Sequence, residues 1–95
     1  MELLGKKLLQ DFKERHADAR SRVESWEAEV EDAQWDTPHD LKKKYPKASL
    51  VGDQQVVFDI SKNRYRLLVR VNYKNKKVLI KKVGTHKEYD KWDIS

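Results

Sequence analysis

Residues 65–73 read YRLLVRVNY, the longest stretch of the chain with the two-residue alternation of a β-strand. Its odd-numbered positions, from Tyr65 to Tyr73, are all apolar or aromatic, so this face of the strand belongs against a core. The even-numbered positions form the opposite face and carry Arg66, Leu68, Arg70 and Asn72. Because a register change of one residue would exchange the two faces, we expect helices on the apolar face and both arginines facing an open concavity.

Shorter extended segments lie on either side of this strand in the sequence. Residues 56–60 indicate a strand before it, and residues 78–83 indicate another after it. Residues 61–64 can turn the chain in the first connection, and Asn75 marks the second. Short connections between successive strands favour an antiparallel meander. Residues 3–4, both leucine, are expected to form a brief additional strand.

The first half of the chain has helical rather than alternating periodicity. Residues 6–16 place their apolar side chains on one helical face and charged side chains on the other. A second apolar stripe recurs at steps of three and four residues, which is typical of a helix that faces a core: Ala19, Val23, Trp26, Val30 and Ala33. Asp18 directly precedes this stripe, in the position of an N-cap.

A third, short helix is predicted to begin after Thr37. The hydroxyl of Thr37 can cap it, Pro38 suits its first turn, and Asp40 can return a hydrogen bond to the cap. The helix must end before Pro46, which disfavours helical geometry at the preceding residue. Residues 42–44 are three lysines near its end, and we assign them to the negative pole of the helix dipole in preference to contact with a ligand.

Together these segments predict an α+β fold, in which two or three N-terminal helices pack on a twisted, mainly antiparallel sheet. Ninety-five residues suffice for one such core, so residues 1–95 are expected to form a single domain. The chain has no cysteine, and its three histidines are too scattered to suggest a zinc site. No apolar run reaches membrane-spanning length and no secretory signal is recognisable, so we expect a cytoplasmic protein with no membrane partner.

The charge of the chain is unevenly distributed. Residues 1–36 hold six Lys/Arg against ten Asp/Glu, whereas residues 37–95 hold fifteen against six. A basic half joined to an acidic half suggests an anionic partner for one surface. Nucleic acid is the first candidate and an acidic protein is the second. A well-solvated surface with no such partner explains the charge alone equally well.

Polar residues with chemical potential gather at the end of the predicted third strand. Lys81 and Lys82 lie within that strand, and one of them must share a face with the arginines, although the alternation leaves open which. Directly after the strand comes GTHKEYD, residues 84–90, which contains His86 and Tyr89. This order places an imidazole, a phenol and a carboxylate beside a basic sheet.

This combination fits the cleavage of RNA. RNA carries its own nucleophile, the 2′-hydroxyl, so a ribonuclease needs a base, an acid and cations but neither a metal nor another cofactor. Histidine is the side chain best suited to proton transfer near neutral pH, and arginine offers a permanently charged fork for phosphate oxygens. Taken singly, a surface or capping role is the more common one for His86, and a core role is the more common one for Tyr89.

The sequence resembles the HigB-type toxins, which are similar in fold to RelE. The resemblance rests on NRYR at residues 63–66, the long apolar strand, and GTHKEYD at residues 84–90. It extends into the helical first half through Trp35, the Thr37-Pro38 helix start and Tyr45-Pro46, and so covers nearly the whole chain.

The resemblance implies a toxin that cleaves mRNA during translation, with the ribosome holding the substrate. By family position, His86 and Tyr89 match the C-terminal catalytic segment, and Arg66 and Lys81 match basic sheet residues. We expect Arg66 to stabilise the charge at phosphorus. Arg70, Lys81 and Lys82 are then expected to contact the RNA backbone. Asn63 matches the family motif as an RNA contact, with a turn-forming role as an equal alternative.

The resemblance also implies a partner and leaves other activities open. The partner is a cognate HigA-like antitoxin, typically a helix-turn-helix protein. Other members of the superfamily, similar to ParE, poison DNA gyrase and lack nuclease activity. A non-enzymatic module that binds RNA or protein through its basic face is the remaining alternative.

Overall fold

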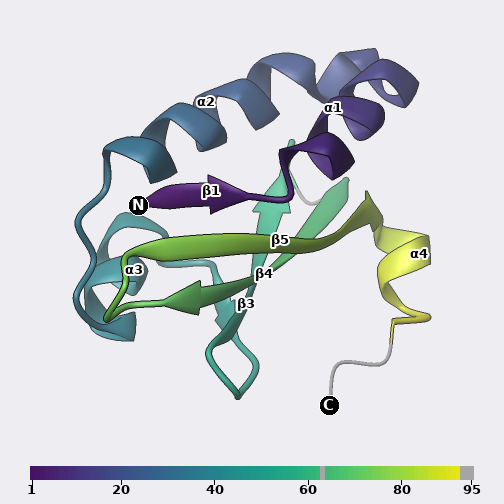
Figure 1. Ribbon diagram of the computed structural model, residues 1–95. Coiled ribbons are helices and arrows are strands. Elements are labelled where there is room, and N and C mark those ends of the chain that lie inside the picture. The colour runs from purple at the N-terminus through teal and green to yellow at the C-terminus, as the bar shows by residue number, and fades with distance from the viewer. Residues whose placement is uncertain (63, 93–95) are drawn as a thin grey trace.

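The computed structural model describes residues 1–62 and 64–92. In chain order these residues form β1 (Glu2–Leu4), α1 (Lys6–Arg15), the 3-10 turn η1 (Ala17–Ala19), α2 (Arg20–Asp32), α3 (Pro38–Lys44), β2 (Ser49–Leu50), β3 (Gln55–Ile60), β4 (Tyr65–Asn72), β5 (Lys77–Thr85) and α4 (His86–Tyr89). The strands make one sheet in the order β1-β5-β4-β3-β2. Figure 1 shows α1 and α2 together over one face of this sheet, with α4 at the end of β5 on the other side.

The sheet confirms the predicted meander. Both the β3–β4 pair and the β4–β5 pair are antiparallel, and β2 adds a short antiparallel edge. The brief first strand also forms, and it pairs in parallel with β5. The α+β class with helices on a mainly antiparallel sheet is therefore confirmed. The sequence pattern predicts neither β2 nor α4, and β5 continues two residues beyond the predicted end, to Thr85.

The core lies between the helices and one face of the sheet, as the alternation in β4 predicts. Tyr65, Leu67, Val69 and Val71 all belong to a buried cluster that also holds the predicted apolar stripe of α2. Val23 and Val30 of that stripe are completely buried. Since complete burial of an apolar side chain stabilises a fold by about 1.5–3 kcal/mol, this interface fixes which face of β4 is turned away from the helices.

One prediction about the second helix is wrong. Asp18 does not cap α2, which begins at Arg20 with Ala19 before it and no side-chain cap. Asp18 lies in η1, where its carboxylate accepts a hydrogen bond of 2.7 Å from the hydroxyl of Tyr65 and pairs with Arg64 at 3.4 Å. The hydrogen bond from Tyr65 lowers the pKa of Asp18, with the charge of Arg64 acting in the same direction. Asp18 therefore ties the helical layer to β4.

The start of α3 is as predicted in most respects. The Thr37 hydroxyl accepts a hydrogen bond from the backbone N–H of Asp40, and Pro38 occupies the first helical position. The carboxylate of Asp40 accepts a hydrogen bond from the backbone N–H of Asp36, which lowers the pKa of Asp40, and the backbone N–H of Thr37 acts in the same direction. At the other end of the helix, the ammonium of Lys42 donates to two backbone carbonyls beyond it, in agreement with a role at the helix terminus.

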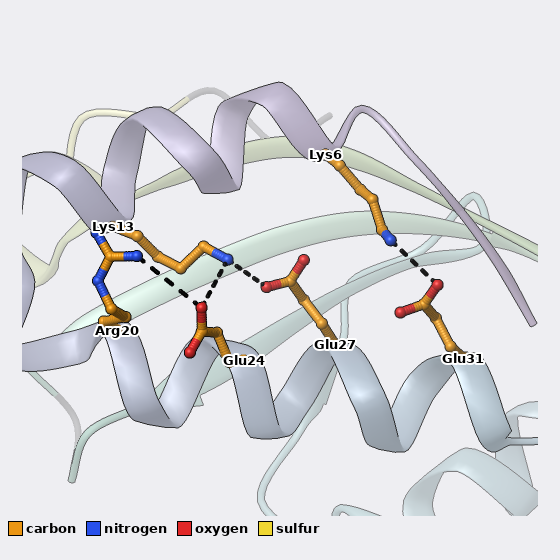
Figure 2. Close-up of polar contacts among 6 residues, drawn as sticks. All are labelled: Lys6, Lys13, Arg20, Glu24, Glu27 and Glu31. Atoms are coloured by element: carbon orange, nitrogen blue, oxygen red, sulfur yellow. Dashed lines mark hydrogen bonds and ion pairs between the residues drawn. The ribbon is translucent and has the colours of Figure 1, made fainter.

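A row of ion pairs joins α1 to α2 (Figure 2). At its centre is Lys13, whose side chain is only 8% exposed and whose ammonium donates to Glu27 at 2.9 Å. The hydrogen bond to Glu27 raises the pKa of Lys13. Glu24 approaches the same ammonium at 3.5 Å, and Lys6 pairs with Glu31 at 3.1 Å. The acidic first half thus uses part of its charge to hold its own helices together.

Candidate functional site

The face of the sheet that is turned away from the helices carries the candidate site. In β4 this open face presents Arg66, Leu68 and Arg70, and their partners in β3 are Asp59, Val57 and Gln55. Val57 and Leu68 are each only 2% exposed, although neither belongs to the core under the helices. The open face therefore has an apolar floor in its middle and charged groups around it.

A β-bulge in β5 resolves which of the two lysines shares this face. Leu68 pairs with Lys82, but the next residue of β4, Val69, pairs with Ile80, so Lys81 is the extra residue. Lys82 lies on the open face because it is the partner of Leu68. The ammonium of Lys81 donates at 3.0 Å to the side-chain oxygen of Gln55, which belongs to the same face. Both lysines thus line the open face, where strict alternation allows only one.

Arg66 is the most enclosed of the predicted basic residues. Its side chain is 10% exposed, and its Nε lies 3.1 Å from a carboxylate oxygen of Asp59. The guanidinium carbon lies 5.5 Å from the centre of the Tyr89 ring, within the range of a cation–π contact. Arg66 therefore does face away from the helices, but the expectation of an open concavity around it is wrong. The reason is that α4 folds back over this end of the face.

Arg70 is separate from this enclosed centre. It is four residues from Arg66 along β4, so the two lie roughly 13 Å apart along the strand. The guanidinium of Arg70 is half exposed and contacts Asp53 at 3.3 Å. Gln55, the cross-strand partner of Arg70, also bonds Lys81. Arg70 and Lys81 therefore form a second basic patch further along the same face.

The segment with His86 and Tyr89 is held by its own cap. The Thr85 hydroxyl accepts from the backbone N–H of Glu88, and the Glu88 carboxylate accepts from the backbone N–H of Thr85 at 2.8 Å. This hydrogen bond from the Thr85 backbone lowers the pKa of Glu88. The backbone N–H of His86 bonds the carbonyl of Arg64 at 3.2 Å, which continues the β4–β5 pairing to the first residue of α4.

This arrangement brings the two predicted catalytic side chains together. The rings of His86 and Tyr89 are 6.2 Å apart between centres and nearly perpendicular. His86 is half exposed, and its Nδ1 lies 3.6 Å from a carboxylate oxygen of Asp90. Tyr89 is partly buried between this imidazole and the guanidinium of Arg66. The sequence places His86 just beyond a strand end; in the structure it is the first residue of a helix.

Two residues of this site are not among those predicted. Asp59 holds Arg66, and the sequence gives a signal for it, since it is the one carboxylate in the otherwise apolar segment VVFDI, residues 56–60. Trp92 lies beside Tyr89, with ring centres 5.5 Å apart, and the ammonium of Lys82 lies 5.9 Å from its ring centre. No periodic pattern marks Trp92, because its position depends on the docking of α4. Asn63, predicted as an RNA contact or a turn residue, lies outside the described residues.

The site combines a rigidly held cation, a phenol and an accessible imidazole. A fixed guanidinium can stabilise charge that develops on a phosphate, because little reorganisation is needed when that charge forms. An imidazole open to solvent can exchange protons with a substrate. Within residues 1–62 and 64–92, no cluster of three or more His, Asp or Glu side chains could hold a metal ion. Nor is any helix in that part of the chain long and apolar enough to cross a bilayer.

Comparison with known proteins identifies the family. Residues 19–92 match a family model described as HigB toxin, the RelE-like toxic component of a toxin–antitoxin system. The mRNA interferase toxin HigB of Escherichia coli (strain K12) is 27% identical over 92 residues, which cover 95% of this chain and 88% of that protein. The mRNA interferase HigB proteins of Escherichia coli O157:H7 and Shigella flexneri match with the same identity and coverage. The residues matched by the family model run from α2 through the candidate site, and the chain belongs to the HigB family of RelE-like toxins, the toxic components of toxin–antitoxin systems.

Proposed function

We propose that this toxin is an endoribonuclease that cleaves mRNA in the cytoplasm without a metal or other cofactor. The observation that carries the proposal is the contact series from Asp59 through Arg66 and Tyr89 to His86 on the open face. It supplies a cation for a phosphate and groups for proton transfer at one place. The names of the matched relatives, mRNA interferases, point to the same reaction.

The proposed reaction uses the nucleophile that RNA carries. The 2′-oxygen attacks the adjacent phosphorus and loses its proton to a base, while the bond from phosphorus to the 5′-oxygen breaks and that oxygen receives a proton from an acid. The products are a 2′,3′-cyclic phosphate and a 5′-hydroxyl, so atoms and protons balance without an external reagent. His86 is the proton-transfer residue in this scheme, and Tyr89 assists it in proton transfer or in orienting the substrate.

Arg66 is assigned to the charge on the phosphorane. Its guanidinium has five N–H donors in a fixed plane, and the bond from Nε to Asp59 sets the direction of that plane. Because the side chain is almost completely enclosed, its interaction with a phosphate is less screened than that of a surface lysine. Arg70, Lys81 and Lys82 surround this centre on the open face and are assigned to the RNA backbone.

Two macromolecular partners follow from the proposal besides mRNA itself. The ribosome would hold the mRNA and supply most of the codon selection. A cognate helix-turn-helix antitoxin of the HigA kind would neutralise the toxin by laying an acidic segment over the Arg/Lys face. The strongly basic balance of residues 37–95 supports both, since that half of the chain forms the sheet and the site.

Inducible expression with mapped transcript ends tests the proposal. Wild type and His86→Ala should be compared with His39→Ala, which removes an exposed histidine of α3 as a matched control. Wild type and the control should produce new ends within translated frames, and His86→Ala should not. Intact transcripts together with DNA damage would contradict the nuclease and favour inhibition of gyrase. Intact transcripts without DNA damage would favour a module that only binds.

A further inference from the structure

A basic cavity lies at the outer edge of β3, beside the proposed catalytic centre. It has a volume of about 610 Å³ and is lined by the loop after α3, by β3 and by the turn that follows β3. The lining residues that matter for its chemistry are Lys44, Tyr45, Lys47, Phe58, Asp59 and Lys62. This volume exceeds that of a single nucleotide and falls in the usual range of small-molecule sites.

The three lysines of this cavity differ from most lysines of the helical half. Those of α1 are engaged with carboxylates, as Lys6 is with Glu31 and Lys13 is with Glu27. Lys44, Lys47 and Lys62 are exposed, and no carboxylate among residues 1–62 and 64–92 lies within ion-pair distance of any of them. Three ammonium groups without a carboxylate partner converge on one cavity, and an anionic ligand would offset their charge.

The interior of the cavity is aromatic. Phe58 and Tyr45 both line it: Phe58 is almost completely buried, Tyr45 is partly exposed, and their ring centres lie 5.1 Å apart. The hydroxyl of Tyr45 donates to Glu29, and the ring of Trp35 packs against the ring of Tyr45 at 6.0 Å. Burial and the bond to Glu29 raise the pKa of Tyr45, so its ring stays neutral. A ring held in this way can stack on a base.

The cavity is connected to the proposed catalytic centre through one residue. Asp59 lines the cavity and also binds Arg66, whose guanidinium lies over the ring of Tyr89. Neighbouring strands are about 4.8 Å apart, so a chain that crosses from β5 over β4 to β3 reaches this edge within a few nucleotides. The unpaired lysines are thus placed where such a chain would leave the open face.

We propose that this cavity binds a nucleotide of the RNA substrate that flanks the cleaved bond. Its base lies against Tyr45, and its phosphates are held by Lys44, Lys47 and Lys62. Lysine binds phosphate as a point charge without base selectivity, and stacking on an aromatic ring tolerates every base. The site therefore adds affinity and direction to the RNA rather than sequence preference. This inference rests on the proposed function, because it assigns the RNA path of the same reaction.

RNA binding by two charge-matched triple variants tests the inference. The cavity variant is Lys44→Gln/Lys47→Gln/Lys62→Gln, and the control is Lys7→Gln/Lys43→Gln/Lys74→Gln, whose exposed lysines do not line the cavity. The probe is a short 2′-O-methyl oligoribonucleotide, which cannot be cleaved because its attacking oxygen is blocked. Binding is followed by fluorescence anisotropy over a series of salt concentrations.

The salt dependence gives the expected result. Each lost phosphate contact lowers the slope of log K against log salt by about 0.7 for single strands. A nucleotide within an RNA chain is flanked by two phosphates, so the cavity variant should lose roughly 1.4 units of slope. The control should lose less than about half of that amount. A third variant, with Lys77→Gln in place of Lys7→Gln, should behave like the control, since its three lysines are all exposed and none has an ion pair in the described part of the chain. A fluorescent adenine analogue at one flanking position should be quenched by wild type and by the control, but not by the cavity variant. Equal slopes for the two variants, or no binding by wild type, would overturn the inference.

Cleavage assays separate this inference from the proposed function. If wild type cleaves RNA and the cavity variant cleaves long RNA with unchanged kcat/KM, the cavity assignment is wrong and the nuclease stands. If wild type shows the cavity-dependent slope but cleaves neither free RNA nor ribosome-bound mRNA, the nuclease is wrong and the RNA site stands. A cavity variant that keeps the wild-type slope but no longer binds its antitoxin would reassign the cavity to an acidic protein segment.

Discussion

Gly84→Ala adds one carbon atom between β5 and α4, and so tests how closely α4 must lie against the sheet for RNA cleavage. Gly84 pairs with Arg66 across β4 and β5, and α4 begins two residues later. A Cβ atom at Gly84 would lie 2.9 Å from Oε1 of Glu88 and 3.3 Å from both Cβ and Cδ of that residue. Relaxed contacts between carbon atoms are about 3.5–4.0 Å, so Gly84→Ala requires Glu88 and the turn that carries it to retreat by roughly 0.5 Å.

The effect should be larger on cleavage than on folding. A misplacement of about 1 Å in a catalytic group can lower the rate by roughly 100-fold, so a retreat of half that distance should lower single-turnover cleavage by about tenfold. The side chains of α4 are exposed or partly exposed, and replacing glycine by alanine also reduces the freedom of the unfolded chain. The free energy of unfolding in urea should therefore change by less than about 1 kcal/mol.

A double-mutant cycle with Glu88→Ala identifies the cause. In the Glu88→Ala background Oε1 and Cδ, two of the three atoms that obstruct the new Cβ, are gone, while Cβ of residue 88 stays and the cap of α4 is weakened. Adding Gly84→Ala there should cost less than about twofold in cleavage, since the two changes act through one contact. If Gly84→Ala alone cleaves at the wild-type rate, or if it costs tenfold in both backgrounds, the position of α4 is not what sets activity.

Three further predictions concern catalysis, the helix pair and pH. His86→Ala should slow single-turnover cleavage by roughly 10²–10⁴-fold and leave the melting temperature nearly unchanged, because its side chain is half exposed; wild-type cleavage would rule out its catalytic role. Lys13→Met leaves the carboxylate of Glu27 without its partner, and the side chain of Glu27 is only 14% exposed. The free energy of unfolding in urea should therefore fall by about 2–3 kcal/mol. The double variant Lys13→Met/Glu27→Leu should recover most of this loss. Failure of the double variant to recover would show that packing, not charge, is responsible. The hydroxyl of Tyr65 lowers the pKa of Asp18 in the folded protein. The hydrogen bond between them therefore contributes fully to stability above the pKa that Asp18 has in the unfolded chain. This contribution is lost as the pH falls through the pKa of Asp18 in the folded protein. The free energy of unfolding of Tyr65→Phe, measured against pH, should lack this decrease at acidic pH. If the variant loses stability at acidic pH as wild type does, the assignment is contradicted.

Periodicity made most of the fold predictable. The two-residue alternation in residues 65–71 reports burial of one strand face, and the three- and four-residue steps from Ala19 to Ala33 report burial of one helix face. Both patterns exist because a long element must keep one side away from water along its whole length. A helix of four residues or a strand of two is shorter than one period, so α4 and β2 leave no such pattern.

For the candidate site, the sequence indicates residue types but not their geometry. The composition of residues 84–90 supports His86 and Tyr89, whereas the enclosure of Arg66 depends on how α4 docks, which is a tertiary contact. The bulge at Lys81 has no counterpart in a periodic pattern, because it is by definition one residue out of step. The hydrogen bond between Asp18 and Tyr65 joins residues 47 positions apart, so local capping rules assign Asp18 the wrong role.

The two layers of the molecule differ in net charge, and under the proposed function this difference determines which face an RNA approaches. In the helical layer, lysine ammonium groups are engaged with glutamates between α1 and α2, as Figure 2 shows, and residues 1–36 still keep an excess of four acidic side chains. In the sheet layer, Arg66 and Asp59 form an enclosed ion pair, and the ammonium of Lys82 lies over the ring of Trp92. The field of the whole protein therefore repels a polyanion from the helical side and attracts it to the open face. Because the helical layer pairs its lysines internally and keeps an acidic excess, the proposed function assigns RNA binding to the open face alone.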